Sequence, residues 1–346
     1  MLTVWVFETF FYLTAQPNTT AQDEGDFTMK IVLLSTSSIA LPALEKIRVH
    51  GDLHTLYTTD PLSPDAAELR HFASTNGIPF LPITKDRLEQ ELLTFTLLHP
   101  DHLVLCLGFS WRLPASLLTD TNRVYNVHFS LLPRYAGPVP LFWQILNGDR
   151  RGGVTIHRVT ERLDAGPVAA RQEVALMPGE NYGLYSARVS MAAATLVEDF
   201  INNAARGQWP AEKAQDVNHR SYQRRPAESD LFINWKQKAD EVEALVNACN
   251  PIAGGAWTFF RGRPLQVLEV SPADGRMKGQ PGTIVHSDPG QGLFVCCGDG
   301  GLLRINVVRM PEGVFSGTKL VAIGFGRGER FGATQPQPNT AIHSSL

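Results

Sequence analysis

The chain has 346 residues, 43% hydrophobic and 19% charged, with a formal net charge of −3 at pH 7. This length suits two domains, and the composition is that of a globular protein rather than a fibrous or disordered one. So small a net charge gives no general attraction to nucleic acid. The four cysteines form no C-x-x-C pair, so they indicate neither a disulfide framework nor a zinc site. We therefore expect a cytoplasmic protein, because that compartment is reducing.

Residues 1–28 differ from the rest of the chain. Residues 2–14 are apolar and aromatic, but they are too short to span a bilayer and have no preceding Lys or Arg, which a signal peptide would have. Residues 15–28 are polar and acidic, as in disordered segments. We expect Met29 to be the natural start and residues 1–28 to be a disordered extension with no membrane role; a membrane-surface anchor is the alternative.

Apolar runs and helical patterns alternate from residue 29 onward. Residues 29–34 (MKIVLL) are typical of a buried parallel strand. The further elements predicted here are helices at 42–47 (with Ser38 as N-cap), 66–76 and 88–98, and strands at 54–58, 79–82 and 103–107. This order predicts an α/β fold, with a mostly parallel sheet covered by helices on both faces. Neither G-x-G-x-x-G nor a Walker A sequence is present, so dinucleotide and nucleoside-triphosphate chemistry lack their usual support.

The segment 124–168 carries the residues with chemical potential. Residues 124–128 and 153–159 read as strands, with a short helix at 138–146 between them. Side chains alternate along a strand, so Asn126 and His128 point to the same face. Short connections in an open α/β sheet bring Asp164 back beside them. The sequence therefore predicts an amide, an imidazole and a carboxylate in one crevice.

Several short motifs in this segment form a recognisable pattern: Asn126-Val127-His128, Ser130-Leu131-Leu132-Pro133, Gly148-Asp149, Gly153-Val154-Thr155 and Leu163-Asp164-Ala165-Gly166. The pattern resembles that of the 10-formyltetrahydrofolate-dependent formyltransferases, and most of all methionyl-tRNA formyltransferases and their nucleotide-sugar relatives. The match is specific over residues 124–168 and weaker from 29 to 331. The resemblance implies a Rossmann-like catalytic domain and a smaller C-terminal OB-like β-barrel domain.

The resemblance implies that Asn126, His128 and Asp164 are catalytic. When an amine attacks the formyl carbon, negative charge develops on oxygen, and the Asn126 amide and the His128 ring can donate hydrogen bonds to it. Asp164 would orient the imidazole, favour its charged form and help to relay a proton to the leaving nitrogen. No metal or covalent intermediate is required. The ordinary alternatives are a structural histidine and a turn-forming aspartate.

The resemblance also implies a slot for 10-formyltetrahydrofolate, the formyl donor. The segment 103–118 would form a wall of this slot and hold the pteridine ring through backbone groups. The residues assigned to it are Gly108, Phe109, Arg112, Leu113, Pro114, Ser130, Leu131, Leu132, Pro133, Leu163 and Ala165. Without the resemblance, 103–118 reads as an ordinary strand, turn and helix. Arg134 and Tyr135 lie in the next loop, near where an acceptor phosphate or ribose could rest. The other histidines, including His157, lack ligand spacing and receive no role.

The remainder of the chain predicts a second domain. A helix at 181–206 closes the catalytic domain (29–206), and the polar, partly basic residues 207–227 read as a linker. Residues 228–332 then form the OB-like domain, followed by a flexible tail at 333–346. The predicted elements of the OB-like domain are a helix at 238–248 and strands at 231–235, 256–260, 265–270, 282–286, 292–297, 302–309 and 318–322.

The amine acceptor stays open at this point. Methionyl-tRNA formyltransferases carry a basic, glycine-rich insertion after the second strand, whereas residues 58–69 here are short and acidic. Residues 279–346 hold five Lys and Arg against four acids, a weak footprint for nucleic acid. Initiator methionyl-tRNA is the first expectation, and a nucleotide-linked amino sugar or an amino-acid derivative is the competitor. The two other candidate classes of function are hydrolysis of the formyl donor and non-catalytic binding of folate or RNA. The sequence does not give the oligomeric state.

Overall fold

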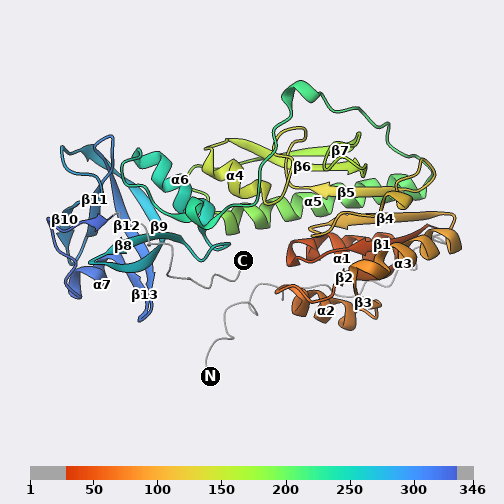
Figure 1. Cartoon of the computed structure of the whole chain (residues 1–346), viewed down its shortest axis with the longest axis horizontal. Coiled ribbons are helices and arrows are strands. Elements are labelled where there is room, and N and C mark those ends of the chain that lie inside the picture. The colour runs from red at the N-terminus through yellow and green to blue at the C-terminus, as the bar shows by residue number, and fades with distance from the viewer. Residues whose placement is uncertain (1–28, 333–346) are drawn as a thin grey trace, which may run out of the picture.

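The computed structural model describes residues 29–332, which form two sheets with their covering helices (Figure 1). The predicted extension at 1–28 and tail at 333–346 lie outside the described residues. Within residues 29–332, the longest helices are too polar or too short to cross a lipid bilayer.

The N-terminal sheet has the strand order β3-β2-β1-β4-β5-β6-β7. The strands are β1 (Lys30–Leu34), β2 (Asp52–Thr59), β3 (Phe80–Ile83), β4 (His102–Leu107), β5 (Val124–His128), β6 (Arg151–Arg158) and β7 (Val168–Ala175). The first five are parallel, and β6 and β7 continue the sheet antiparallel. The predicted mostly parallel sheet is confirmed. Strand β7 was not predicted, because its Ala, Arg, Gln and Glu residues have low strand propensity.

Helices cover both faces of this sheet, as predicted. They are α1 (Leu41–His50), α2 (Ala66–Thr75), α3 (Lys85–Leu98), α4 (Pro140–Leu146) and α5 (Tyr182–Ala205). Side chains of β1 alternate between two cores: Ile31 and Leu33 lie in the core that includes α1 and α5, and Val32 and Leu34 in the core that includes α3. The first helix is preceded by a 3-10 turn that is capped by Ser37, and the N-cap of α1 itself is Ala40 rather than the predicted Ser38.

The C-terminal part is a curled antiparallel sheet (Figure 1), in keeping with the predicted OB-like barrel. Its strands are β8 (Ala256–Phe260), β9 (Arg263–Arg276), β10 (Ile284–Asp288), β11 (Gly292–Cys296), β12 (Gly301–Met310), β13 (Gly313–Ser316) and β14 (Phe331–Gly332), with helices α6 (Ala239–Cys249) and α7 (Gly317–Ala322). The order is β10-β11-β12-β9-β8-β14, with β13 on β12. Backbone hydrogen bonds from Ile284 N to Glu329 O and from Phe331 N to Gly282 O, both 2.8 Å, draw the two ends of the order together.

Two strand predictions in this part were wrong. Residues 231–235 follow a 3-10 turn (Glu228–Leu231) and make only a single bridge, between Phe232 and Trp257. Residues 318–322 belong to α7, whose N-cap Ser316 accepts a hydrogen bond from Lys319 N. Both segments are short apolar runs, which fit a buried strand and a helical turn equally well.

The segment predicted as a linker is packed against the N-terminal sheet over much of its length. We call residues 212–223 the strap. Lys213 pairs with Val168 at the start of β7 through backbone hydrogen bonds of 2.8 and 2.9 Å. Glu212 accepts a hydrogen bond of 2.6 Å from the Tyr125 hydroxyl and forms an ion pair with Arg158 at 2.8 Å. The strap therefore has a fixed course over strands β5 to β7.

A buried hydrogen-bonded bridge supports the end of β5. Gln144 of α4 donates from Nε2 to Phe129 O at 2.8 Å and accepts from the Tyr185 hydroxyl of α5 at 2.9 Å. Replacing Gln144 with Leu leaves both partners buried and unpaired, so we expect the free energy of unfolding to fall by about 1–3 kcal/mol. Urea denaturation measures the change. Tyr185→Phe removes one hydroxyl and leaves the carbonyl paired, so it should lose less; equal stability of all three proteins would contradict this role.

Candidate functional site

A cavity of about 640 Å³ opens where β1, β4 and β5 end, at the carboxyl edge of the parallel sheet. A volume of this size suits a small-molecule ligand, and this edge is where open α/β sheets bind ligands. Its lining comes from loops after β1, β4 and β5, from β6, and from the segments that lead toward the C-terminal part. The lining includes Gly108, Phe109, Ser110, Arg112, Leu113, Asn126, His128, Gly137, His157, Leu163, Asp164, Tyr222, Arg225 and Ile252.

The three predicted catalytic side chains converge in this cavity. His128 Nδ1 lies 3.9 Å from Asp164 Oδ2, and both side chains are less than a tenth exposed. Asn126 precedes His128 by two residues on β5 and shares its face, as alternation predicted. The Nδ1–Oδ2 separation is too long for a direct hydrogen bond. A polar group of a ligand can therefore contact both atoms at once.

A hydrogen bond sets which nitrogen of the neutral His128 ring carries the proton, and burial favours that neutral form. Its Nε2–H donates to Tyr135 O at 2.8 Å, so in the neutral ring the unprotonated nitrogen is Nδ1, on the Asp164 side. Burial lowers the pKa of His128, and the charges of His157 and Arg220 act in the same direction, against the charge of Asp164 and the Tyr135 carbonyl. The neutral form of the ring is consequently favoured near pH 7. This differs from the expectation of a charged, donating imidazole, because burial outweighs the carboxylate.

The Asp164 carboxylate is held ionised. Burial would raise its pKa, but the charges that His128 and His157 carry when they are protonated, together with the backbone N–H of Gly137, outweigh that effect and lower the pKa to about 2. Gly137 N donates to Oδ2 at 2.8 Å. Gly137 has φ +102°, and a Cβ there would lie 2.2 Å from Gln223 O, so only glycine fits between the strap and the carboxylate.

His157 is a member of the site that was assigned no role from sequence. It faces Asn126 across the antiparallel β5–β6 pair, and its Nε2 accepts a hydrogen bond from Asn126 Nδ2 at 3.2 Å. Its Nε2 also lies 3.6 Å from Asp164 Oδ1, and its Nδ1–H donates to Arg158 O at 2.9 Å. His157 thereby orients the Asn126 amide, whose second N–H has no hydrogen-bond partner among residues 29–332. The register of the β5–β6 pair is the signal that would have revealed it.

The segment after β4 lines the cavity with open backbone. Gly108, Phe109, Arg112 and Leu113 all lie on the lining, as does Leu163 on the opposite side. Among residues 29–332, no hydrogen bond with another backbone group reaches the peptide groups of 110–113. Those peptide groups are available to a planar ligand that carries hydrogen-bond donors and acceptors.

Six residues assigned to the folate slot are not on the cavity lining: Pro114, Ser130, Leu131, Leu132, Pro133 and Ala165. Ser130 and Leu132 are fully buried. Ser130 Oγ donates to Arg134 O at 2.7 Å, and Leu132 N donates to Thr155 Oγ1 at 3.2 Å. The Ser-Leu-Leu-Pro turn is thus tied to β6, where it shapes the loop that presents the Tyr135 carbonyl to His128.

The loop residues suggested for an acceptor also lie elsewhere. Arg134 forms an ion pair with Asp149 at 3.0 Å, and Tyr135 is buried. Instead, Tyr222 and Arg225 reach the cavity from the segment that follows α5, and Ile252 reaches it from the C-terminal part. Tyr222 is 58% exposed, and the Arg225 guanidinium has no ion pair within the described residues.

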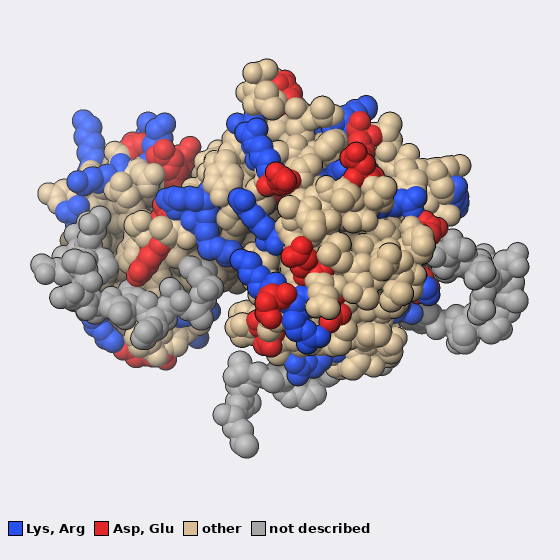
Figure 2. Space-filling model, turned by 45° about the vertical axis from the view of Figure 1, so that its right-hand side comes forward, with Lys and Arg blue, Asp and Glu red and all other residues tan. Residues whose placement is uncertain are grey.

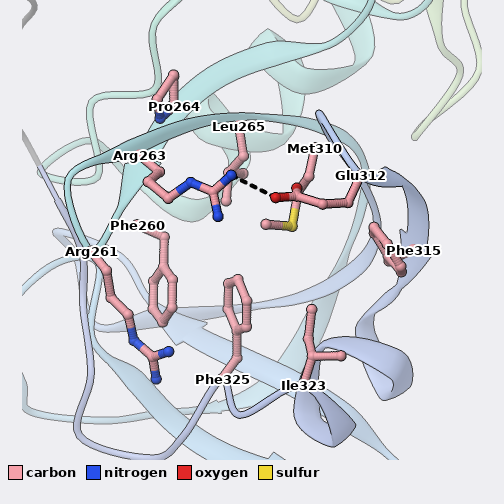
Figure 3. Close-up of a pocket in the computed structure, with 10 residues that line it drawn as sticks. All are labelled: Phe260, Arg261, Arg263, Pro264, Leu265, Met310, Glu312, Phe315, Ile323 and Phe325. Atoms are coloured by element: carbon pink, nitrogen blue, oxygen red, sulfur yellow. Dashed lines mark hydrogen bonds and ion pairs between the residues drawn. The ribbon is translucent and has the colours of Figure 1, made fainter.

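A second, smaller cavity of about 260 Å³ lies in the C-terminal sheet (Figure 3). Its charged side chains are paired with nearby acids: Arg263 with Glu312 at 2.5 Å, and Arg261 with Glu329 at 2.7 Å. The Phe260 and Phe325 rings stack at 3.8 Å. Paired charges and stacked rings leave no free group for chemistry there. Across residues 29–332, no group of three or more His, Cys, Asp or Glu is placed to hold a metal ion.

Comparison with known proteins places the chain in a family. Residues 14–200 match the formyl transferase model and residues 227–319 match the model of the formyl transferase C-terminal domain. The methionyl-tRNA formyltransferase of Citrifermentans bemidjiense is 31% identical over 306 residues, 84% of this chain and 94% of that protein. That of Geobacter metallireducens is 29% identical over 282 residues, 79% of this chain and 89% of the other.

Solved structures show the same fold at lower identity. An N-formyltransferase from Helicobacter canadensis, in complex with folinic acid and dTDP-3-aminofucose, has a TM-score of 0.59 at 17% identity, over 80% of this chain and 98% of that one. HypX from Aquifex aeolicus, in complex with tetrahydrofolic acid, has a TM-score of 0.56 at 17% identity, over 84% of this chain but only 46% of that longer chain. Family models, relatives and fold agree: the chain belongs to the formyl transferase family and is a formyltransferase.

Proposed function

We propose that this enzyme transfers a formyl group from 10-formyltetrahydrofolate to a primary amine, with Asn126, His128 and Asp164 as its catalytic residues. The observation that carries the proposal is the convergence of those three side chains in one cavity beside the open backbone of residues 110–113. That backbone and the neighbouring Phe109 and Leu113 suit a flat pteridine ring that carries its own donors and acceptors.

The proposed chemistry divides between the three groups. As the amine attacks, its nitrogen loses a proton, and His128 Nδ1 is the unprotonated nitrogen that takes it. Asp164, 3.9 Å away, stabilises the imidazolium that forms. The free N–H of Asn126 donates to the formyl oxygen as negative charge develops there. His128 then returns the proton to the nitrogen of the donor that leaves, so the products are an N-formyl amine and a protonated N10.

The proposal makes His128 a base, which predicts the direction of its titration. Because burial lowers its pKa, we expect the midpoint of the His128 ring to lie below the ordinary 6.5. The unfolded imidazole binds a proton below 6.5 while the folded one resists it, so the free energy of unfolding falls as the pH drops through that region. An NMR titration, assigned with a His128→Gln variant, measures the midpoint. A midpoint above 6.5 would rule out the neutral base.

For the acceptor we propose methionyl-tRNA. The curated relatives at about 30% identity that cover most of this chain are methionyl-tRNA formyltransferases. Tyr222 and Arg225 at the cavity mouth suit a nucleotide base and a phosphate. Figure 2 also shows Lys and Arg side chains gathered in a band across the middle of the face it displays, a surface that could meet an RNA backbone.

One observation favours a small amine instead. The connection from β2 to α2 is short, and its Asp65 accepts hydrogen bonds from Ser38 N at 2.8 Å and from the Ser37 and Ser38 hydroxyls at 3.0 and 3.1 Å. This acid therefore stabilises the turn after β1, and the connection offers no basic extension. The one or two phosphates of a nucleotide-linked amino sugar would need only one or two cations, and Arg225 on the cavity lining supplies one.

A panel of acceptors tests the proposal and separates its two forms. The enzyme is incubated with 10-formyltetrahydrofolate and methionyl-tRNA, amino-sugar nucleotides or ornithine derivatives, and the formylated product is identified by mass spectrometry. Formylated methionyl-tRNA, with a KM that rises steeply with salt, supports the tRNA acceptor. Formylation of a small amine alone overturns that acceptor. No formylated product from any amine, with formate released at full rate, overturns the transfer itself.

A further inference from the structure

The loop that carries Asp164 is held in an unfavourable backbone conformation. Asp164 has φ +49°, in the left-handed region that non-glycine residues rarely adopt. Within the loop, the only backbone hydrogen bond close to it runs from Ala165 N to Arg162 O at 3.2 Å. Such a conformation persists only when surrounding groups hold it in place.

Two side chains of the strap supply those groups. Arg220 donates from Nη2 to Leu163 O at 2.6 Å and from Nη1 to Asp164 O at 3.0 Å. Gln215 donates from Nε2 to Asp164 O at 3.1 Å and to Gly166 O at 2.7 Å. Four hydrogen bonds thus fix three carbonyls within four residues. The planar fork of the guanidinium matches two neighbouring carbonyls in a way that a single ammonium does not.

The same strap fixes the opposite wall of the site. Ser221 Oγ accepts a hydrogen bond from Tyr135 N at 2.8 Å, and Ser221 O accepts one from Ala136 N at 2.9 Å. The Tyr135 carbonyl holds His128, and the neighbouring Gly137 N–H holds Asp164. The spacing between the imidazole and the carboxylate is therefore set from one segment, which reaches both loops.

We propose that Arg220 and Gln215 are positioning residues of the formyl-transfer site, which act through the Asp164 loop, and that the strap sets the distance between Asp164 and His128. The proposal rests on the function proposed above. Arg220 also contributes its charge: together with His157 it opposes protonation of His128, which Asp164 favours. Geometry and charge make separate contributions, so different variants can test them separately.

The test compares four variants of the full chain: Arg220→Gln, Arg220→Lys, Gln215→Ala and the control Arg224→Gln. Arg224 lies just after the strap, but its guanidinium pairs with Asp230 at 2.9 Å and does not reach the loop. We expect Arg220→Gln to lower kcat by about 100-fold, with little change in KM for donor or acceptor, because small displacements of catalytic groups are that costly. Hydrogen exchange in peptides covering residues 160–166 should become faster, and the His128 titration midpoint should rise.

The other variants separate the causes. Arg220→Lys keeps the charge but not the fork, so it should lower kcat and speed exchange while the His128 midpoint stays in place. Gln215→Ala should likewise lower kcat and speed hydrogen exchange while the His128 titration midpoint stays in place. Arg224→Gln should match the wild type at saturating acceptor.

If Arg220→Gln and Gln215→Ala both kept the wild-type kcat and the wild-type rate of hydrogen exchange in residues 160–166, the positioning role would be overturned. Exchange and NMR need no turnover, so they still test the strap if the wild type formylates no amine and the proposed function itself fails.

Discussion

Changing Asp164 to Asn is expected to lower kcat for formyl transfer by about 10²- to 10⁴-fold, the usual range for loss of a group that supports proton transfer. The amide has nearly the same shape and still accepts the hydrogen bond from Gly137 N, so the fold should survive. What is lost is the negative charge 3.9 Å from His128 Nδ1, which stabilises the imidazolium during the reaction. Steady-state formylation at saturating donor and acceptor measures the effect.

The matched control is Asp149→Asn. Asp149 also pairs with a cation, Arg134, but it is only partly buried and is not on the cavity lining. It should keep wild-type kcat. If Asp164→Asn retained wild-type turnover while the thermal midpoints of both variants matched the wild type, the role given to Asp164 would have to be withdrawn.

Changing Asn126 to Ala is expected to lower kcat by about 10²- to 10³-fold, as found when one oxyanion-hole donor is removed. The amide is positioned by its hydrogen bond to His157 Nε2, and the residue lines the cavity. The KM for the folate donor should change little, because the bond strengthens only as charge develops on the formyl oxygen. Single-turnover rates at saturating donor measure the chemical step without product release.

Asn122→Ala provides the control for this variant. Asn122 lies just before β5, and its side chain donates to Leu117 O at 3.1 Å, away from the cavity. The same chemical change there should leave the single-turnover rate intact. A drop in KM of the same size as the drop in kcat for Asn126→Ala would instead point to relief of ground-state strain.

The sequence was informative where chemistry follows a local pattern. Strand alternation is enough to place Asn126 and His128 on one face, and apolar runs such as 29–34 are enough to predict a buried parallel sheet. The Asp164 loop followed from the short connections of such folds. These features depend on neighbours in the chain, so a single sequence contains them.

The features that the sequence did not reveal depend on contacts between distant segments. His157 joins the site through the register of an antiparallel pair, which periodicity does not set. The strap has no periodic pattern and reads as a linker, yet side chains such as Gln215 and Arg220 order it by hydrogen bonds to a loop about 50 residues earlier. The tautomer of His128 depends on which nitrogen meets the Tyr135 carbonyl, which tertiary geometry decides.

The most direct test of the account is the rate of tetrahydrofolate formation from 10-formyltetrahydrofolate by the wild-type enzyme, measured with and without an acceptor amine. If the cavity catalyses transfer, tetrahydrofolate forms only when the amine is present, and one formylated amine appears for each tetrahydrofolate. The same rate without any amine, with formate as the second product, would show that water is the acceptor. That result would contradict the central claim that the site activates an amine for attack on the formyl carbon.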